Sequence, residues 1–365
     1  PKARKTADYL ALCFKSIGLS PVRGAFIHAI PGGQNVFGLL KGKGPGVIVV
    51  QAHYDTEGQG QAAGDNTAGV ASLLEMASIL KGSGKLERSV LFACFDGEEY
   101  GFMGARDFLR NPPVPLNTVD TFLAIDRIGH PFGGGPSWRL LVSGSEYCSS
   151  LRLALSTRPW FVQPVGDDLF GNRSSISLFR EQRIPFLFFT NGPYPEVHGP
   201  EDVAERLDFR MMNEQVDFLS KLTVSLANAP TRFRFTSFKK EVKDAPILAK
   251  MWEESSTRLK MLPASYQGAV ASLDRQLKEK RPNRSTLSRA YQLMETAATP
   301  WVIAEMDAAG EARNCERKND KYGALQAYRK ALRISRTKSA REWYLKRLKD
   351  LSQSNELNQT QEPRY

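Results

Sequence analysis

Four apolar runs in this sequence each lead into a histidine or a carboxylate, and this pattern restricts the fold more than any other feature. The runs at 47–52, 89–95, 121–125 and 185–190 are followed by His53, by Glu98 with Glu99, by Asp126 and by His198. Short apolar runs of this kind are typical of strands buried on both faces of a parallel sheet. Ligands bind beyond the carboxyl ends of such strands. We therefore expect these side chains to meet at one edge of one sheet, joined by Asp65 at the start of a helical pattern.

Helical patterns alternate with these runs and indicate an α/β fold, a mixed but mainly parallel sheet with helices on both faces. Strand-like segments near 24–30 and 35–40 flank Pro31-Gly32-Gly33 and predict an antiparallel pair. A long helix from 203 to 227 closes this part of the chain. Beyond Pro230 strand patterns vanish, and prolines separate roughly four helices. An all-α C-terminal region therefore follows the sheet.

Charge supports a boundary at the same place. The chain of 365 residues has a net charge of +11, and residues 231–365 hold 28 Lys and Arg against 16 Asp and Glu. We predict a catalytic domain at 1–230, a basic helical region at 231–351 and a disordered tail at 352–365. Residues 319–335 resemble the second helix of a tetratricopeptide unit. A solenoid needs about three units, so we expect one hairpin packed on the catalytic domain.

The basic region has two interpretations. It could bind an acidic partner, nucleic acid or a membrane surface, or it could be a solvated helical surface, which the lack of a nucleic-acid motif favours. No run approaches the roughly 18 apolar residues of a transmembrane segment. The four cysteines lie far apart and leave the compartment open.

The polar residues at the sheet edge stand in the order of a known family. His53-Tyr54-Asp55, Gly64-Asp65-Asn66-x-x-Gly69, Gly97-Glu98-Glu99-x-Gly101, Asp126 and His198 resemble the motifs of the di-zinc aminopeptidases of metallopeptidase family M28. The resemblance covers about residues 5–226. It implies the zinc-exopeptidase fold, which is phosphorylase/hydrolase-like, a peptide substrate, and an exported or membrane-anchored location.

The resemblance also implies a role for each motif residue. His53 and Asp126 would bind one zinc ion, Glu99 and His198 the other, and Asp65 would bridge the two. Glu98 would be the general base that takes a proton from the metal-bridging water. Asp55 would fix the tautomer of His53. The thiolate-free donor set suits two Zn²⁺ in an open catalytic site, although ligand type alone does not separate zinc from Co²⁺ or Mn²⁺.

Three positions depart from the family pattern. Ser175 and Ile176 stand where many relatives carry an acid and a histidine. No tyrosine adjoins His198, so we consider Tyr194 as an oxyanion contact from a different position. Arg127 follows Asp126 where a neutral residue is more familiar, and it would hold either a substrate carboxylate or a structural ion pair.

These residues favour a zinc-dependent aminopeptidase that acts on free N-terminal residues. Arg127 alone supports a carboxypeptidase or dipeptidase on the same metals. A glutaminyl-cyclase-like acyltransferase also fits the Glu98 motif, but such relatives use one zinc ion. The remaining alternative is a non-catalytic binding protein with a peptidase fold. The intact ligand set and Glu98 argue against it.

Overall fold

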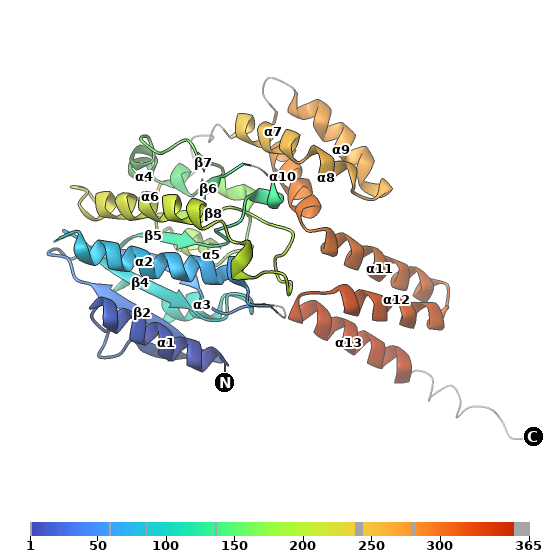
Figure 1. Ribbon diagram of the computed structural model, residues 1–365, viewed down its shortest axis with the longest axis horizontal. Coiled ribbons are helices and arrows are strands. Elements are labelled where there is room, and N and C mark those ends of the chain that lie inside the picture. The colour runs from blue at the N-terminus through green and yellow to red at the C-terminus, as the bar shows by residue number, and fades with distance from the viewer. Residues whose placement is uncertain are drawn as a thin grey trace, which may run out of the picture.

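A computed structural model describes residues 2–57, 60–84, 86–135, 137–237, 244–278 and 282–353 of this chain. It contains one sheet of eight strands in the order β1-β2-β4-β3-β5-β8-β6-β7. The strands are β1 (Ile27–Ile30), β2 (Gly33–Leu40), β3 (Val47–His53), β4 (Ser89–Phe95), β5 (Val119–Ile125), β6 (Leu140–Ser143), β7 (Val162–Pro164) and β8 (Phe186–Thr190). Figure 1 shows this sheet in the N-terminal part of the chain and a helical part beyond it.

The centre of the sheet is parallel, as the four apolar runs predict. β4, β3, β5 and β8 run in one direction, whereas β2 joins β4 and β6 joins β8 in antiparallel pairs. Every residue of β3, β5 and β8 is buried. The predicted antiparallel pair at the start is also confirmed, since β1 pairs with β2 around residues 31–32. The carboxyl ends of the four parallel strands therefore share one edge.

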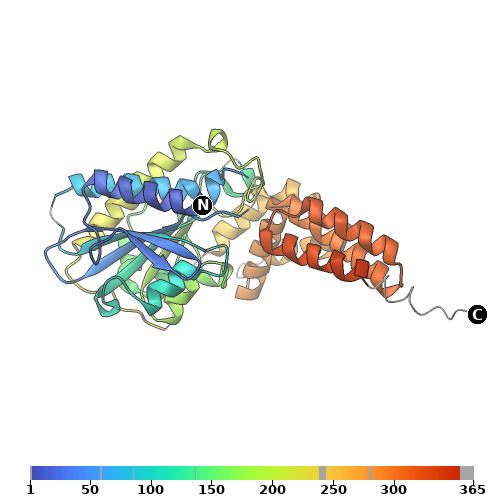
Figure 2. The same cartoon turned by 90° about the horizontal axis from the view of Figure 1, so that it is seen from below.

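Helices cover both faces of the sheet (Figure 2). One core contains apolar residues of α1 (Lys2–Ile17), α2 (Ala68–Gly82), α4 (Ser149–Ala154) and α6 (Phe209–Ala227). The other core lies under α3 (Met103–Arg110) and α5 (Ile176–Glu181), where Phe122 stacks on Phe179 and Phe108 contacts both rings edge to face. Among the described helices, none combines the length and apolarity needed to cross a bilayer.

Seven helices form the described part of the chain from residue 245 to residue 353. They are α7 (Ala245–Glu254), α8 (Ser256–Lys260), α9 (Ala264–Leu277), α10 (Arg284–Ala298), α11 (Pro300–Arg317), α12 (Lys321–Ile334) and α13 (Lys338–Gln353). α7 to α10 add Leu248, Trp252 and Tyr291 to the second core of the sheet. α11 to α13 pack around a separate core that includes Ala312, Tyr328 and Tyr344. The division of the chain into domains stays a prediction.

Two expectations about helices are wrong in detail. α6 begins at Phe209, not at residue 203, because the Asp208 side chain caps the helix by accepting from the Met211 amide, and the preceding residues form a separate 3₁₀ turn. The estimate of roughly four C-terminal helices is too low. Prolines mark several helix starts, but the breaks at Ser255, Asn319 and Ser335 carry none. Residues 354–365 of the predicted tail lie outside the described residues.

Candidate metal centre

The carboxyl edge of the sheet brings the predicted ligands together in two groups. His53, Asp65 and Asp126 form one, and Glu57, Glu99 and His198 form the other, with the donor atoms in each group within 4.8 Å of one another. β3 ends at His53, the turn after β4 carries Glu99, β5 ends directly before Asp126, and the loop after β8 carries His198. The chain thus converges on this edge from four strands that lie side by side.

Asp65 belongs to the first group and also contacts the second, with one carboxylate oxygen toward each histidine. Its Oδ1 is 3.3 Å from His53 Nε2, and its Oδ2 is 3.2 Å from His198 Nε2. Asp126 Oδ1 is 3.3 Å from the same nitrogen of His53, and Glu99 Oε1 is 3.5 Å from that of His198. A carboxylate held in this way can bridge two cations that are each bound by one imidazole.

Local contacts hold Asp65 in this position. The carboxylate of Asp202, itself fully buried, accepts from the Gly64 amide at 2.8 Å. On the other side, the Asn66 side chain donates to the Ile125 carbonyl at 2.9 Å and accepts from the Arg127 amide at 3.3 Å. These bonds tie the loop to the end of β5, next to Asp126.

The glycines of the motif make room for this loop. A Cβ at Gly64 would overlap Tyr194 and His130, and a Cβ at Gly69 would overlap the Asn66 side chain. The expectation that Asp65 opens a helix is wrong, because its backbone is extended (φ −124°, ψ 85°) and α2 begins three residues later. Its rigidity comes from the tethers of the loop rather than from a helix N-terminus.

Asp55 holds the turn that follows β4. Its Oδ1 accepts from the Glu98 amide at 3.0 Å and its Oδ2 from the Glu99 amide at 3.1 Å. The carbonyl oxygen of Asp55, at 3.1 Å, lies nearer to His53 Nδ1 than its carboxylate does, at 3.6 Å. The residue predicted to fix the His53 tautomer therefore contacts that ring mainly through its backbone, and its carboxylate orients the two glutamates.

Glu98 contacts the loop before α5, and its charge also interacts with those of His53 and Asp126. Its Oε1 accepts from the Ser175 amide at 2.8 Å, and its buried Oε2 has no hydrogen-bond partner among the described residues. Burial raises the pKa of Glu98 to about 7. Ser175, at one of the positions that depart from the family pattern, thus contacts the predicted base through its backbone.

The electrostatics of the centre favour cations. Burial alone would lower the pKa of His198, but the carboxylates of Asp65 and Glu99 raise it to about 10. The pKa of His53 is likewise raised well above its usual value, against the effect of burial, by neighbouring carboxylates. The carboxylates that favour a protonated imidazole would also favour a divalent cation, whose binding would displace the proton.

The donor set fits a pair of divalent ions. Four carboxylates and two imidazoles occupy the two groups, so the groups carry a formal charge of −4 when the imidazoles are neutral. Arg127 offsets one of these charges, since its Nε is 3.5 Å from Asp65 Oδ2 and 3.7 Å from Asp126 Oδ2. Buried charges need compensation, and nitrogen with oxygen donors suits zinc. Arg127 therefore makes the structural ion pairs considered from the sequence.

Tyr194 does not occupy the position expected of an oxyanion contact. Its side chain is fully buried, its hydroxyl donates to Asp202 Oδ2 at 2.7 Å, and its ring stacks on His130 at 4.0 Å. A hydroxyl committed in this way offers no open face to a substrate. Tyr194 instead supports Asp202 and, through it, the Asp65 loop.

Sequence reasoning missed Glu57. This residue is buried beside Glu99 and His198, yet it stands in an irregular loop four residues after the end of β3. The one sequence feature that could have indicated Glu57 is its position shortly after a strand that ends in a ligand. No motif distinguishes such a carboxylate from the solvent-exposed acidic residues that are common in loops. Its position depends on the fold of the loop.

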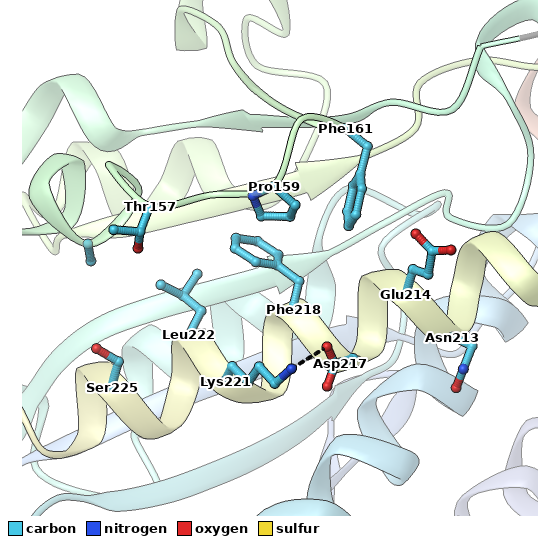
Figure 3. Close-up of a pocket in the computed structure, with 11 residues that line it drawn as sticks. Thr157, Pro159, Phe161, Asn213, Glu214, Asp217, Phe218, Lys221, Leu222 and Ser225 are labelled. Atoms are coloured by element: carbon cyan, nitrogen blue, oxygen red, sulfur yellow. Dashed lines mark hydrogen bonds and ion pairs between the residues drawn. The ribbon is translucent and has the colours of Figure 1, made fainter.

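A second depression lies far from these residues, along the outer side of α6. Phe218 and Leu222 of α6 point toward Pro159 and Phe161 of the loop before β7 (Figure 3). Asp217 and Lys221 at its rim pair with each other at 2.7 Å. None of the candidate ligands lines this groove, so we do not connect it with the metal centre.

Comparison with known proteins identifies relatives of the sheet region. The family model described as "Peptidase family M28" matches residues 35–223. Aminopeptidase YwaD of Bacillus subtilis is 35% identical over 206 residues, which cover 51% of this chain and 43% of YwaD. A vacuolar membrane protease of Candida tropicalis is 24% identical over 195 residues, covering 50% of this chain and 20% of that protein. The chain thus spans less than half the length of these curated relatives.

Solved structures share the fold. The LapA aminopeptidase of Legionella pneumophila matches with a TM-score of 0.52 and 19% identity, over 62% of this chain and 65% of that chain. LapB from the same organism matches with a TM-score of 0.51 and 19% identity, over 61% and 65%. At this level of identity the likeness concerns the fold alone.

Proposed function

This chain belongs to peptidase family M28, and on that premise we propose that it is a zinc-dependent aminopeptidase that releases N-terminal residues from peptides with a free amino end. The observation that carries the proposal is the position of Asp65, which directs one carboxylate oxygen toward each of two buried histidines. The name of the relative YwaD, an aminopeptidase, supports the same activity.

The two ligand groups would each hold one zinc ion. His53 and Asp126 would bind one, Glu99 and His198 would bind the other, and Asp65 would be shared. Glu57, which lies beside Glu99 and His198, could also bind the second ion. When bound, zinc supplies a Lewis acid that strengthens water as a nucleophile and polarises the scissile carbonyl.

Glu98 is the proposed general base. The Ser175 amide holds one of its oxygens, which leaves Oε2 without a partner among the described residues and available for a proton. A buried carboxylate with one free oxygen is suited to accept a proton from the attacking water and then give it to the leaving amine. The bonds from Asp55 to the backbone of Glu98 and Glu99 keep the base beside the ligands.

The other activities considered from the sequence receive less support. A carboxypeptidase would need a cation for the substrate carboxylate, but Arg127 already faces Asp65 and Asp126. A cyclase-like enzyme would need one zinc ion, whereas two ligand groups are present. A binding protein without activity would have no use for a buried, unpartnered Glu98 oxygen.

Hydrolysis of aminoacyl anilides, measured before and after chelation, tests the proposal. The zinc-loaded chain should release aniline from free-amine substrates, lose this activity with the chelator, and ignore N-acetylated analogues. Release of the C-terminal residue from an N-blocked dipeptide would indicate a carboxypeptidase instead. Cyclisation of N-terminal glutamine without anilide hydrolysis would indicate cyclase-like chemistry, and no turnover of any substrate would leave a binding protein.

We also propose an exported or membrane-associated location. The name of the relative from Candida tropicalis, a vacuolar membrane protease, supports it. Fractionation of cells that express the chain at its natural length would test the proposal, and recovery in the cytosolic fraction alone would contradict it.

A further inference from the structure

A large cleft adjoins the metal centre on the side of the C-terminal helices. It has a volume of about 840 Å³, and its walls include Tyr100 and His198 from the sheet region and Trp301, Arg333, Arg336 and Leu345 from the helices. Figure 1 shows one end of the α11–α13 group facing the sheet region. We call this space the α11–α13 cleft. The helices that line this cleft lie beyond the family match, which ends at residue 223. The cleft nevertheless extends to His198, a proposed zinc ligand.

Specific contacts fix the helices at this edge. The Trp301 ring lies 6.3 Å from the ring of His198, and the guanidinium of Arg336 lies 5.5 Å from the centre of the Trp301 ring. Arg336 also donates to the Pro195 carbonyl at 3.3 Å and lies 3.6 Å from Glu201 Oε2. These contacts join the α12–α13 connection and α11 to the loop that carries His198. The helical wall is therefore part of the site rather than a remote appendage.

The size of the cleft indicates which part of a peptide it would hold. An aminopeptidase accommodates a single residue on the amino side of the scissile bond. A space of about 840 Å³ is within the range of drug-sized ligand pockets and exceeds what one side chain needs. The residues after the scissile bond are the part of the substrate that must extend away from the metals. Trp301, Ile334 and Leu345 offer apolar surface to such a segment.

The charges in the cleft indicate which peptides it would prefer. Arg336 faces Glu201, and Arg341 donates to the carbonyls of Leu332 and Ser335 at the end of α12. Glu342 interacts with Tyr100. Burial raises the pKa of this tyrosine, and the charge of Glu342 is one of several carboxylate charges that raise it further. Arg333 is exposed, and no ion pair or hydrogen bond joins it to another described residue. It is the arginine of this cleft that remains available for a ligand.

We propose that the α11–α13 cleft binds the peptide segment that follows the scissile bond, and that Arg333 selects segments with an acidic side chain. This inference rests on the proposed aminopeptidase function and deepens it by naming the substrate class. A peptide would pass from the metal centre over Trp301 toward Arg333. The ion pair would form in the peptide complex and leave the chemistry at the metals unchanged, so Arg333 determines specificity and is not a catalytic residue.

The test compares peptide sequence preference in Arg333→Glu and in a matched control. Arg329→Glu makes the same charge change one turn earlier on α12, at an exposed position outside the cleft. The substrates are pentapeptides that differ by Glu or Lys at their second, third or fourth residue, and an aminoacyl anilide that lacks this segment. Release of the first residue gives kcat and KM for each zinc-loaded protein.

We expect the wild-type chain to prefer a Glu peptide over its Lys counterpart by about three- to fivefold in kcat/KM, the size of one exposed ion pair. The difference should lie in KM and shrink at high salt. Arg333→Glu should reverse the preference, Arg329→Glu should keep it, and all three should hydrolyse the anilide equally.

Equal kcat/KM for Glu and Lys peptides in the wild-type chain, with normal anilide hydrolysis, would overturn the inference and leave the proposed function intact. An unchanged preference in Arg333→Glu would also overturn it. Failure of the zinc-loaded wild-type chain on the anilide and on every peptide would refute the proposed function, and the inference would fall with it.

Discussion

Replacing Tyr194 by phenylalanine separates a structural role of this residue from a catalytic one. The substitution removes the hydroxyl that donates to Asp202 at 2.7 Å and keeps the ring that stacks on His130. A buried hydrogen bond to a charged acceptor contributes about 1.5–3 kcal/mol. Asp202 keeps its bond from the Gly64 amide, so the Asp65 loop should stay in place. We expect the free energy of unfolding to fall by about 2 kcal/mol.

The rate should respond much less. An oxyanion contact contributes about 10²–10³ in kcat, whereas the zinc-saturated Tyr194→Phe protein should lose less than about tenfold. Urea denaturation of the zinc-loaded protein and kcat on an aminoacyl anilide measure the two effects separately. Tyr9→Phe is the control, because this tyrosine is 63% exposed on α1. A hundredfold loss of kcat with unchanged stability would refute our account of Tyr194.

Asp202→Ala extends this test to the partner of the hydroxyl. It leaves the Gly64 amide and the Tyr194 hydroxyl without their buried acceptor. At about 1–3 kcal/mol for each unsatisfied group, the free energy of unfolding should fall by about 2–6 kcal/mol. Because Asp202 holds the loop that carries Asp65, zinc affinity should also fall, by about 10–100-fold. Zinc affinity equal to that of the wild-type chain would contradict the positioning role.

Three further predictions follow from the site and the fold. Glu98→Gln should lower kcat by about 10²–10⁴ with unchanged zinc content, and normal turnover would exclude it as the base. Gly69→Ala should displace Asn66 and lower stability by about 1–3 kcal/mol, whereas Gly82→Ala, with open space around it, should not. Burial raises the pKa of Glu146 to about 7, so its stabilising contribution is present below its unfolded pKa near 4.5 and lost as pH rises through 7. Between about pH 4.5 and pH 7, the unfolding free energy of the wild-type protein should therefore fall by about 3 kcal/mol more than that of Glu146→Gln. Unfolding free energies of the two proteins that change in parallel with pH would contradict this.

The fold and the meeting of the ligands were predictable because both depend on strand pattern. Apolar runs that bury both faces must lie in a sheet, and residues that follow parallel strands must share an edge. His53, Asp126 and His198 could be placed together on this basis alone. The sheet and its helices on both faces confirm the predicted fold class.

Loop contacts were not predictable, because they depend on tertiary packing. Asp65 precedes a helical pattern, but its rigidity comes from Asp202, which is far away in the sequence. Tyr194 and Glu57 likewise lie in irregular segments where no periodicity fixes the direction of a side chain. Sequence patterns therefore locate ligands at strand ends better than they locate the groups that hold those ligands.

The C-terminal wall of the cleft shows the same limit. The helical pattern and basic charge of residues 231–351 were apparent, and they suggested either a partner-binding surface or a solvated one. No sequence pattern indicated that Trp301 would lie beside His198. That contact requires α11 to dock against a loop about 100 residues earlier in the chain.

The zinc content of the wild-type chain and of Asp65→Ala tests the central claim most directly. Both proteins would be saturated with zinc, freed of loosely bound metal and measured by elemental mass spectrometry against protein concentration. A shared Asp65 predicts two zinc ions per wild-type chain and loss of both affinities in the variant, because the variant lacks the carboxylate oxygens that Asp65 directs toward His53 and toward His198. One zinc ion per wild-type chain, or a variant that retains two, would contradict a centre bridged by Asp65.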